Sequence, residues 1–185
     1  MTQTSDDELV RRFQRGDGRA FEALVERHQD RIFRLATAML RSRDDAADAA
    51  QEVFLRAYQG LPRFRFGAAP FTWMYRTLRH VCSELNRRER AGERPAVAEP
   101  ASTVDAGVAL DAERRLERVL ANVAVLPERQ RDVLLLRVFE GMSVAETARA
   151  LGCRPGTVKA QLHRALARLE ALEPAAFPHD EEKDA

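Results

Sequence analysis

The sequence has few of the features that mark exported, membrane-spanning or metal-binding proteins. Among its 185 residues are only two cysteines, Cys82 and Cys153, and neither has a His or Cys near it at the spacing of a metal site. We therefore expect reduced, structural thiols and a cytoplasmic location. No run approaches about 18 consecutive apolar residues, and the acidic N-terminus is unlike a secretory signal. We expect no membrane insertion.

The patterns that enzymes need are also missing. No nucleophile with an adjacent base, no glycine-rich phosphate loop and no set of metal ligands is visible. His28 lies on the apolar stripe of a predicted helix, which favours a packed histidine over a catalytic one. We therefore expect no catalytic residue, no metal and no cofactor. Turnover by the purified protein would be needed to support a hydrolase or nuclease.

What the chain does have is a separation of charge that its net charge of +1 hides. Residues 61–94 carry a net charge of +5 and residues 148–173 carry +3, whereas the other segments are acidic. Basic clusters of this kind are typical of surfaces that bind nucleic acid. The simplest account is two such surfaces, separated along the chain.

Helical periodicity accounts for most of the remaining pattern. Apolar residues recur three and four positions apart in both halves of the chain. In the helix that begins near Ser42, this spacing predicts that Ala47, Ala50, Phe54, Ala57 and Tyr58 face inward. Pro and Gly residues interrupt the periodicity after Ala91. We predict an all-α fold with these parts: a helical domain at 5–92, a flexible linker at 93–110, a second helical domain at 111–173 and an acidic, disordered tail at 174–185.

The segment that begins at Gly141 predicts a DNA-binding motif. Ser143 and Glu146 form an S-x-x-E capping box, which begins a short helix, and Gly152 is placed to end it. Pro155 then begins a second helix after a tight turn. Two helices joined in this way predict a helix-turn-helix.

The face of the second helix decides what this motif could do. Because Val158 and Leu162 belong to its apolar stripe, the helical repeat turns four residues outward: Lys159, Ala160, His163 and Arg164. A DNA major groove admits such a helix, and Lys and Arg can reach guanine or phosphate. The alternative is an ordinary helical hairpin whose charges are solvated.

Another helix face is acidic. Asp45, Asp48 and Glu52 form a row of carboxylates with Gln51 beside it. Arg56 stands four residues beyond Glu52, where an ion pair would stabilise a solvated helix. From periodicity alone we favour a solvated face over a binding surface.

The segment that follows alternates arginine with phenylalanine. Arg63, Phe64, Arg65 and Phe66 lie in a loop bounded by prolines, and a helix opened by further aromatic residues follows. Bases of single-stranded nucleic acid stack on aromatic rings while arginine follows the phosphates. The alternative is that the rings fill a small helical core, and we favour this for Phe71 and Trp73.

Four separated motifs resemble the extracytoplasmic-function (ECF) group of bacterial RNA polymerase sigma factors. They are residues 45–57 (DAADAAQEVFLRA), 71–76 (FTWMYR), 126–131 (LPERQR), and 156–159 together with 163–165 (GTVK and HRA). The resemblance covers roughly residues 8–172, and four motifs in the right order make it highly specific.

This resemblance implies a non-enzymatic subunit that binds core RNA polymerase and directs promoter-specific initiation. The N-terminal domain would be sigma region 2, which binds the polymerase clamp and opens the −10 element. The C-terminal domain would be region 4, which reads the −35 element and touches the polymerase flap. The linker would run through the polymerase, and an anti-sigma factor would control the protein.

The resemblance also assigns residues by position. The clamp surface would be Asp45, Asp48, Gln51, Glu52 and Phe54, which reverses the preference for a solvated face. The −10 site would be Arg63, Phe64, Arg65, Phe66, Arg76, Arg79 and His80. The −35 site would be Arg154, Thr157, Lys159, Ala160, His163 and Arg164.

The chain departs from the family pattern at three positions. Members often have Asn where His80 stands, Asp where Glu84 stands and Ser where Ala160 stands. The runner-up interpretation is a conventional repressor or activator that uses the helix-turn-helix on an operator without polymerase. That interpretation predicts a dimer and two-fold operators, and it gives the acidic face and the aromatic loop no role.

Overall fold

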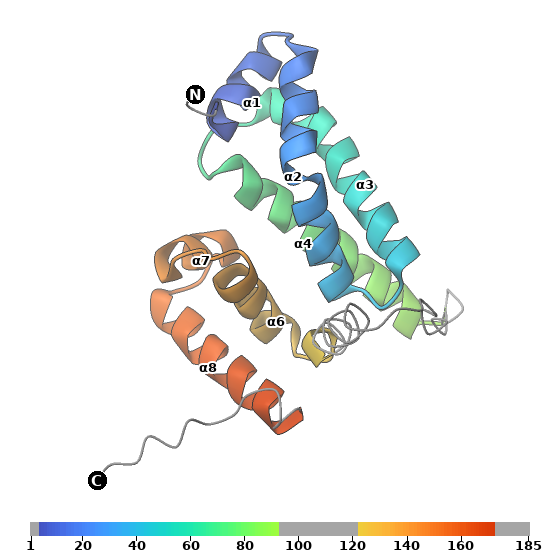
Figure 1. The fold of residues 1–185 in the computed structure, drawn as a ribbon, viewed down its shortest axis with the longest axis vertical. Coiled ribbons are helices and arrows are strands. Elements are labelled where there is room, and N and C mark those ends of the chain that lie inside the picture. Colours follow the sequence, from blue (N-terminus) through green and yellow to red (C-terminus); the bar gives the residue numbers. More distant parts are fainter. Residues whose placement is uncertain (1–3, 93–121, 173–185) are drawn as a thin grey trace, which may run out of the picture. The chain divides into compact units, whose positions relative to one another are not determined.

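The structure, a computed structural model, describes residues 4–92 and 122–172. Every regular element in these two ranges is helical, so the all-α prediction is confirmed (Figure 1). The chain divides into two compact units, Met1–Glu113 and Arg114–Ala185. The predicted linker, the predicted tail and most of the helix expected after Asp111 lie outside the described residues. The predicted domain boundaries therefore stay predictions.

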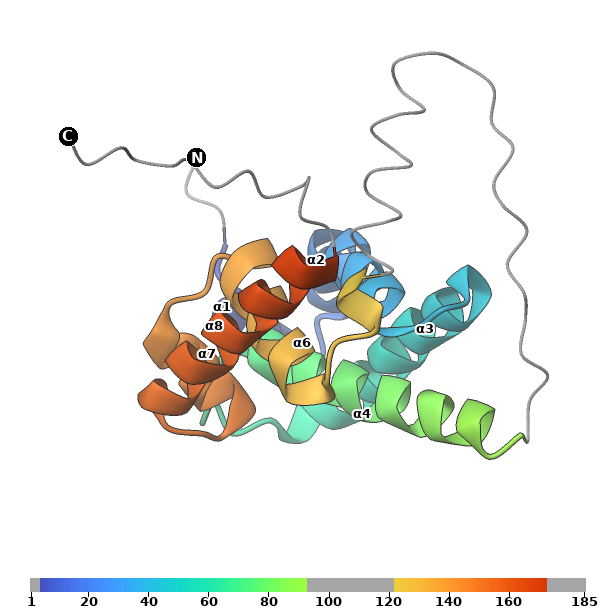
Figure 2. The same ribbon diagram turned by 90° about the horizontal axis from the view of Figure 1, so that it is seen from below.

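The first unit packs its helices around the long helix α2. Its described elements are α1 (Asp6–Gln14), α2 (Gly18–Met39), α3 (Arg43–Gly60), the 3₁₀ turn η1 (Leu61–Arg63) and α4 (Pro70–Arg90). Helix α2 packs against α1, α3 and α4, and α3 packs against α4. Figure 1 shows α2 and α3 alongside each other, and Figure 2 shows α4 running beside α3.

Two helices of this unit, α1 and α3, begin at serine residues that cap them. The Ser5 hydroxyl accepts a hydrogen bond from the Glu8 amide at 3.3 Å, and the Ser42 hydroxyl accepts one from the Asp45 amide at 3.2 Å. These bonds satisfy amides that have no partner within the helix. The core between the helices consists of fully buried apolar side chains, among them Leu24, Ile32, Val53, Tyr75 and Leu78.

The predicted inner face of α3 is partly wrong. Ala47 is exposed and Tyr58 is 58% exposed, whereas Ala46, Ala49 and Val53 are buried. Alanines occur all round this helix, so periodicity alone could not select the core face. Packing against α2 and α4 selected the stripe whose small side chains let the helices approach closely.

The second unit is a smaller helical bundle. Its described elements are α6 (Glu128–Leu134), the π-helical turn η2 (Leu135–Phe139), α7 (Val144–Leu151) and α8 (Pro155–Leu172). Helix α8 packs against both α6 and α7. The sequence predicts one continuous helix from Glu128 to Phe139, and the structure instead widens its last turn.

This π turn has a packing consequence. The Glu140 amide donates to the Leu135 carbonyl at 3.0 Å, five residues back, and Gly141 then ends the segment with φ +62°. A π turn holds more residues than an α turn. It accompanies three consecutive buried leucines, Leu134, Leu135 and Leu136. Helical periodicity could not predict this π turn. In a regular α-helix, one of three consecutive leucines would point away from a single core face.

Candidate nucleic-acid interface

The helix-turn-helix is present as predicted. The Glu146 amide donates to the Ser143 hydroxyl at 3.2 Å, and the Ser143 amide donates to the Glu146 carboxylate at 2.8 Å. The Ser143 hydroxyl, followed by the Ser143 amide, holds the pKa of Glu146 below its usual value. Gly152 ends α7 in the left-handed conformation, with φ +64°. Helix α8 begins at Pro155.

The rotation of α8 is set by its buried residues. Val158 is completely buried and packs with Val133 and Ala148, with Leu151, Cys153 and Leu162 around them. Ala165 and Leu169 continue the buried stripe. All four residues of the predicted outward face are exposed: Lys159, Ala160, His163 and Arg164. Arg154 is exposed as well, and Thr157 is half-buried.

The aromatic loop of the first unit is an ordered cluster. The rings of Phe64 and Phe66 meet edge to face at a centroid distance of 5.1 Å, and the Arg11 guanidinium lies 4.6 Å from the Phe66 centroid. Phe66 has φ +54°, in the left-handed region. The predicted strand-binding arginines Arg63 and Arg65 are exposed beside these half-buried rings.

The other predicted −10 residues lie on α4. Arg76 and His80 are exposed and Arg79 is half-buried, so this face is open to solvent over about one turn. On the opposite side Met74, Leu78 and Val81 are buried, so α4 has one apolar side in the core and one polar side facing solvent.

Phe71 is structural, as we favoured from the sequence. It is 6% exposed, it stacks on His28 at 5.6 Å, and the Arg31 guanidinium lies 3.3 Å from its ring centroid. Trp73 is half-buried against the end of α3, where a Cβ atom added to Gly60 would lie 2.9 Å from Cζ2 of the indole. These two rings are therefore packing groups rather than part of the loop cluster.

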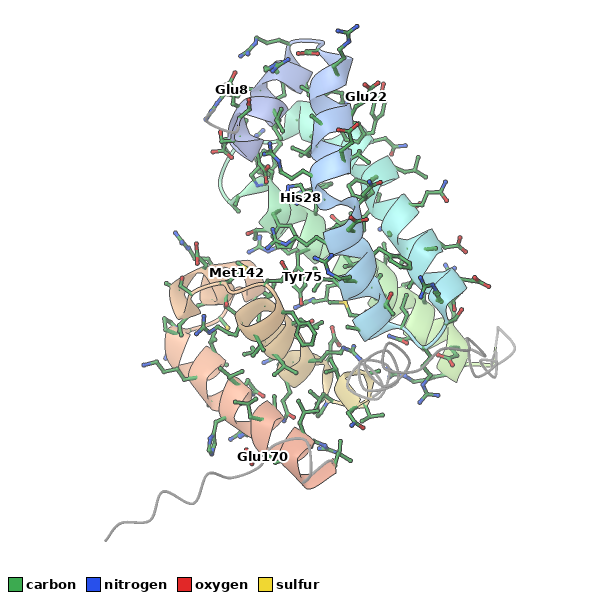
Figure 3. All side chains as sticks on the ribbon, in the orientation of Figure 1. Glu8, Glu22, His28, Tyr75, Met142 and Glu170 are labelled. Atoms are coloured by element: carbon green, nitrogen blue, oxygen red, sulfur yellow. The ribbon has the colours of Figure 1, made fainter. Side chains whose placement is uncertain are left out.

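His28 is a packed residue, in agreement with the sequence prediction. It is 3% exposed, and its Nε2 lies 2.8 Å from a carboxylate oxygen of Asp6 (Figure 3 labels His28). Arg27 donates to the other oxygen of Asp6 at 2.6 Å. Burial raises the pKa of Asp6, but the His28 and Arg27 contacts outweigh it and hold this pKa below its ordinary value. The contacts of Asp6 with Arg27 and His28 therefore connect α1 to α2.

The acidic face of α3 is partly open to solvent. Asp48 and Gln51 are exposed, whereas Asp45, Glu52 and Phe54 are half-buried. Glu52 accepts from Arg56 at 2.7 Å, so the expected ion pair is also present. An exposed pair of this kind contributes about 0.3–0.5 kcal/mol, which leaves the face available for another role.

Sequence reasoning missed two residues that border this face. Leu55 is 53% exposed and Tyr58 is 58% exposed, and they follow Gln51 by four and seven positions on the same helix. Large exposed apolar side chains beside a polar face are typical of protein-binding surfaces. Leu55 could have been found from the sequence, because it lies off the predicted apolar stripe.

Two kinds of site are absent from the described part of the chain. In residues 4–92 and 122–172, no group of three His, Cys, Asp or Glu side chains is placed to hold a metal ion. None of the helices in these ranges is both long and apolar enough to cross a membrane. Cys82 is buried and Cys153 is half-buried, and both are free thiols.

The chain is similar to known proteins over both units. Residues 24–92 match the family Sigma-70 region 2, and residues 116–169 match the family Sigma-70, region 4. The chain is 35% identical over 192 residues to the RNA polymerase sigma-H factor of Pseudomonas aeruginosa, a match that covers 96% of this chain and 97% of that protein. It is 34% identical over 168 residues to the ECF RNA polymerase sigma factor SigM of Mycobacterium tuberculosis, covering 91% and 84%.

A solved structure shares the fold. The structure of CnrH in complex with the cytosolic domain of CnrY aligns with a TM-score of 0.74 and 27% identity, covering 94% of this chain and 100% of that one. Sequence and fold therefore agree over nearly the whole chain. The chain belongs to the ECF group of the sigma-70 family, whose members are non-catalytic specificity subunits of bacterial RNA polymerase.

Proposed function

We propose that this sigma factor divides promoter recognition between its two units. In this proposal residues 111–173 form region 4 and read the −35 duplex through α8. Residues 5–92 form region 2 and hold the −10 strand through the aromatic loop and α4. The family matches over 24–92 and 116–169 support this division, as does the position of the two basic segments.

The exposed face of α8 supports the −35 assignment. Arg164 and Lys159 can donate to guanine O6 and N7 or to phosphate, and a good base contact contributes about 1–3 kcal/mol of discrimination. Ala160 has no polar atom on its side chain, so it can add only apolar contact, for example with a thymine methyl group. His163 adds a further polar group on the same face.

The aromatic loop supports the −10 assignment on energetic grounds. Breaking one base step costs about 1.4 kcal/mol of stacking, and extruding a base costs a few more. A base stacked on an aromatic ring regains about 1–3 kcal/mol. Phe64 and Phe66 can therefore hold a strand once polymerase helps to open it. They cannot melt a promoter without that help.

The α3 face supports the assignment to the polymerase clamp. Asp48 and Gln51 are exposed, and Leu55 and Tyr58 add apolar area next to them. A surface that combines carboxylates with exposed apolar side chains suits a basic protein partner with an apolar patch. We assign Asp45, Glu52 and Phe54 to the edge of this surface, because they are half-buried.

A protein inhibitor and a cytoplasmic location complete the proposal. The structure of CnrH holds a second protein, the cytosolic domain of CnrY. We propose by analogy that an anti-sigma factor covers the polymerase-binding surfaces of this chain. A subunit that works on RNA polymerase would do so in the cytoplasm.

One observation carries the proposal: the burial of Val158 fixes α8 so that the four predicted DNA-facing residues are all exposed. In-vitro transcription with purified core polymerase tests it. We expect promoter-specific run-off transcripts only when the protein is added. Operator binding without stimulation of core polymerase would contradict the proposal and indicate a repressor.

A further inference from the structure

We propose that α1 positions the aromatic loop that contains Phe64 and Phe66, and that Gln14 is the positioning residue. The inference rests on the proposed function of that loop and goes further, because it concerns a residue outside every motif discussed above. Gln14 lies 47 residues before Leu61 and 50 before Phe64, and its side chain contacts the backbone of both.

The side-chain amide of Gln14 bridges the two ends of the η1 turn. Its Nε2 donates to the Leu61 carbonyl and to the Phe64 carbonyl, at 2.9 Å each. Carbonyls at the end of a helix have no intrahelical amide to accept from, and the Phe64 carbonyl follows the last residue of η1. The Phe64 amide also donates to the Leu61 carbonyl at 3.0 Å. Gln14 thus closes the turn that leads into the loop.

The same helix holds the ring of Phe66. Non-glycine residues in the left-handed region are strained by roughly 1–2 kcal/mol, and such strain persists only where neighbours over-determine the conformation. Phe66 has φ +54°. Its ring contacts Phe64 at 5.1 Å and the Arg11 guanidinium at 4.6 Å. Arg11 and Gln14, three residues apart on α1, therefore hold the ring and the backbone of the loop.

Helix α1 has its own anchors, which do not depend on the loop. Asp6 accepts from Arg27 and contacts His28 on α2. Phe13 packs against Phe21 at 5.0 Å and against Tyr58 at 5.4 Å. Leu9 and Val10 are buried. Loss of the Gln14 amide should therefore leave the unit folded and release only the loop.

The test measures how strongly the protein prefers a single strand of −10 sequence over a scrambled strand. A variant that merely folds correctly need not keep this preference. The chain bound to core polymerase is titrated with a single-stranded oligonucleotide that carries its −10 sequence, and with a scrambled one. Gln14→Met removes both donors but keeps the charge, the approximate size and the helix propensity. We expect it to reduce the preference for the −10 strand about tenfold, since two neutral hydrogen bonds are lost. Affinity for core polymerase and for −35 duplex should not change.

Two further variants make the test specific. Gln29→Met is the matched control, because Gln29 is an exposed glutamine of α2. It should behave as the wild type. Gln14→Lys keeps a side chain that can donate to both carbonyls, and it should restore the preference for the −10 strand over the scrambled strand. Its added charge acts on both strands alike and cancels in that ratio.

The outcomes separate this inference from the proposed function. If the wild type shows no preference for the −10 strand, the proposed function of the loop fails. If the wild type has a preference and Gln14→Met keeps it, the positioning role is overturned. Failure of Gln14→Lys to restore the preference also overturns it, because the donors would then not be what matters. Should Gln14→Met not fold, Gln14→Glu replaces it with the same expected loss.

Discussion

Asp6 joins α1 to α2 through a single carboxylate. It accepts from Arg27 at 2.6 Å and contacts His28 at 2.8 Å, and its side chain is 22% exposed. Removing one partner of a part-buried charged network leaves the others without compensation. This contact should therefore make the first unit sensitive to acid.

We expect Asp6→Asn to lower the free energy of unfolding of the first unit by about 1–3 kcal/mol at pH 7. The folded pKa of Asp6 lies below the ordinary aspartate value of 3.8. Its stabilising effect is therefore complete above about pH 5 and is lost as the pH falls through the folded pKa. Chemical denaturation of both proteins from pH 7 to pH 3 measures this.

The control for that experiment is Asp7→Asn. Asp7 lies in the same first turn of α1, so the Asp7→Asn substitution removes the same favourable charge from the helix N-terminus. A gap between wild type and Asp6→Asn that does not shrink at low pH, or an equal effect of Asp7→Asn, would contradict the prediction.

Gly60 allows Trp73 to pack against the end of α3. A Cβ atom at this position would lie 2.9 Å from Cζ2 and 3.1 Å from Cη2 of the indole. We expect Gly60→Ala to destabilise the first unit by roughly 1–3 kcal/mol. The emission of the single tryptophan should also shift to the red. Gly18→Ala is the control, since a Cβ there meets nothing within 4 Å, and an equal loss in both variants would reject this explanation.

Arg164 is the residue on which the −35 assignment depends most directly. It is exposed on α8, and we expect Arg164→Ala to reduce discrimination between correct and altered −35 duplexes by about 1–3 kcal/mol. Binding to core polymerase should be unchanged. Equal loss of affinity on every sequence would instead make Arg164 a phosphate contact.

At the scale of elements, the turn between α7 and α8 depends on a backbone conformation. Gly152 has φ +64°, and the next amide, that of Cys153, donates to the Ala148 carbonyl at 3.0 Å. This is the geometry of a left-handed helix C-cap, in which glycine avoids the steric cost of a Cβ atom. The cost of replacing it is therefore predictable from the local structure.

We expect Gly152→Ala to lower the free energy of unfolding of the second unit by roughly 1 kcal/mol or more. Gly156→Ala, four residues later in the first turn of α8, should be neutral or stabilising, because its Cβ meets nothing within 4 Å and alanine favours helix. Thermal unfolding followed by circular dichroism distinguishes them. The same loss in both variants would show that the left-handed cap is not the cause.

At the scale of the whole molecule, the proposed function gives the surfaces of the two units different partners. The proposal therefore predicts that substitutions on α3 and on α8 affect different steps of initiation. We expect Asp48→Arg, on the exposed face of α3, to weaken binding to core polymerase at least several-fold by placing like charge against a basic partner. Binding of the isolated protein to −35 duplex should stay the same.

Asp30→Arg makes the same charge change on an exposed position of α2 and serves as the control. Fluorescence anisotropy with labelled core polymerase and with labelled duplex measures both affinities. Core affinity that is unchanged in Asp48→Arg, or reduced equally in Asp30→Arg, would return the α3 face to an ordinary solvated surface.

Much of this protein follows from its sequence alone. The capping box of Ser143 and Glu146, the glycine that ends α7 and the outward face of α8 were all predictable, and the structure has them. The packed state of His28 was predictable as well. Each depends on residues three or four positions apart on one helix, so the physics that decides them is local.

Other features were decided only by the tertiary structure. The buried face of α3 depended on which alanines met α2 and α4, and the π turn depended on how Leu134 to Leu136 met the rest of their unit. The contact of Gln14 with the η1 turn joins residues 47 and 50 positions apart. The reason is physical. Spacing along the chain determines which side chains share a face of one helix, whereas the segment that this face contacts is determined only when separate parts of the chain pack together.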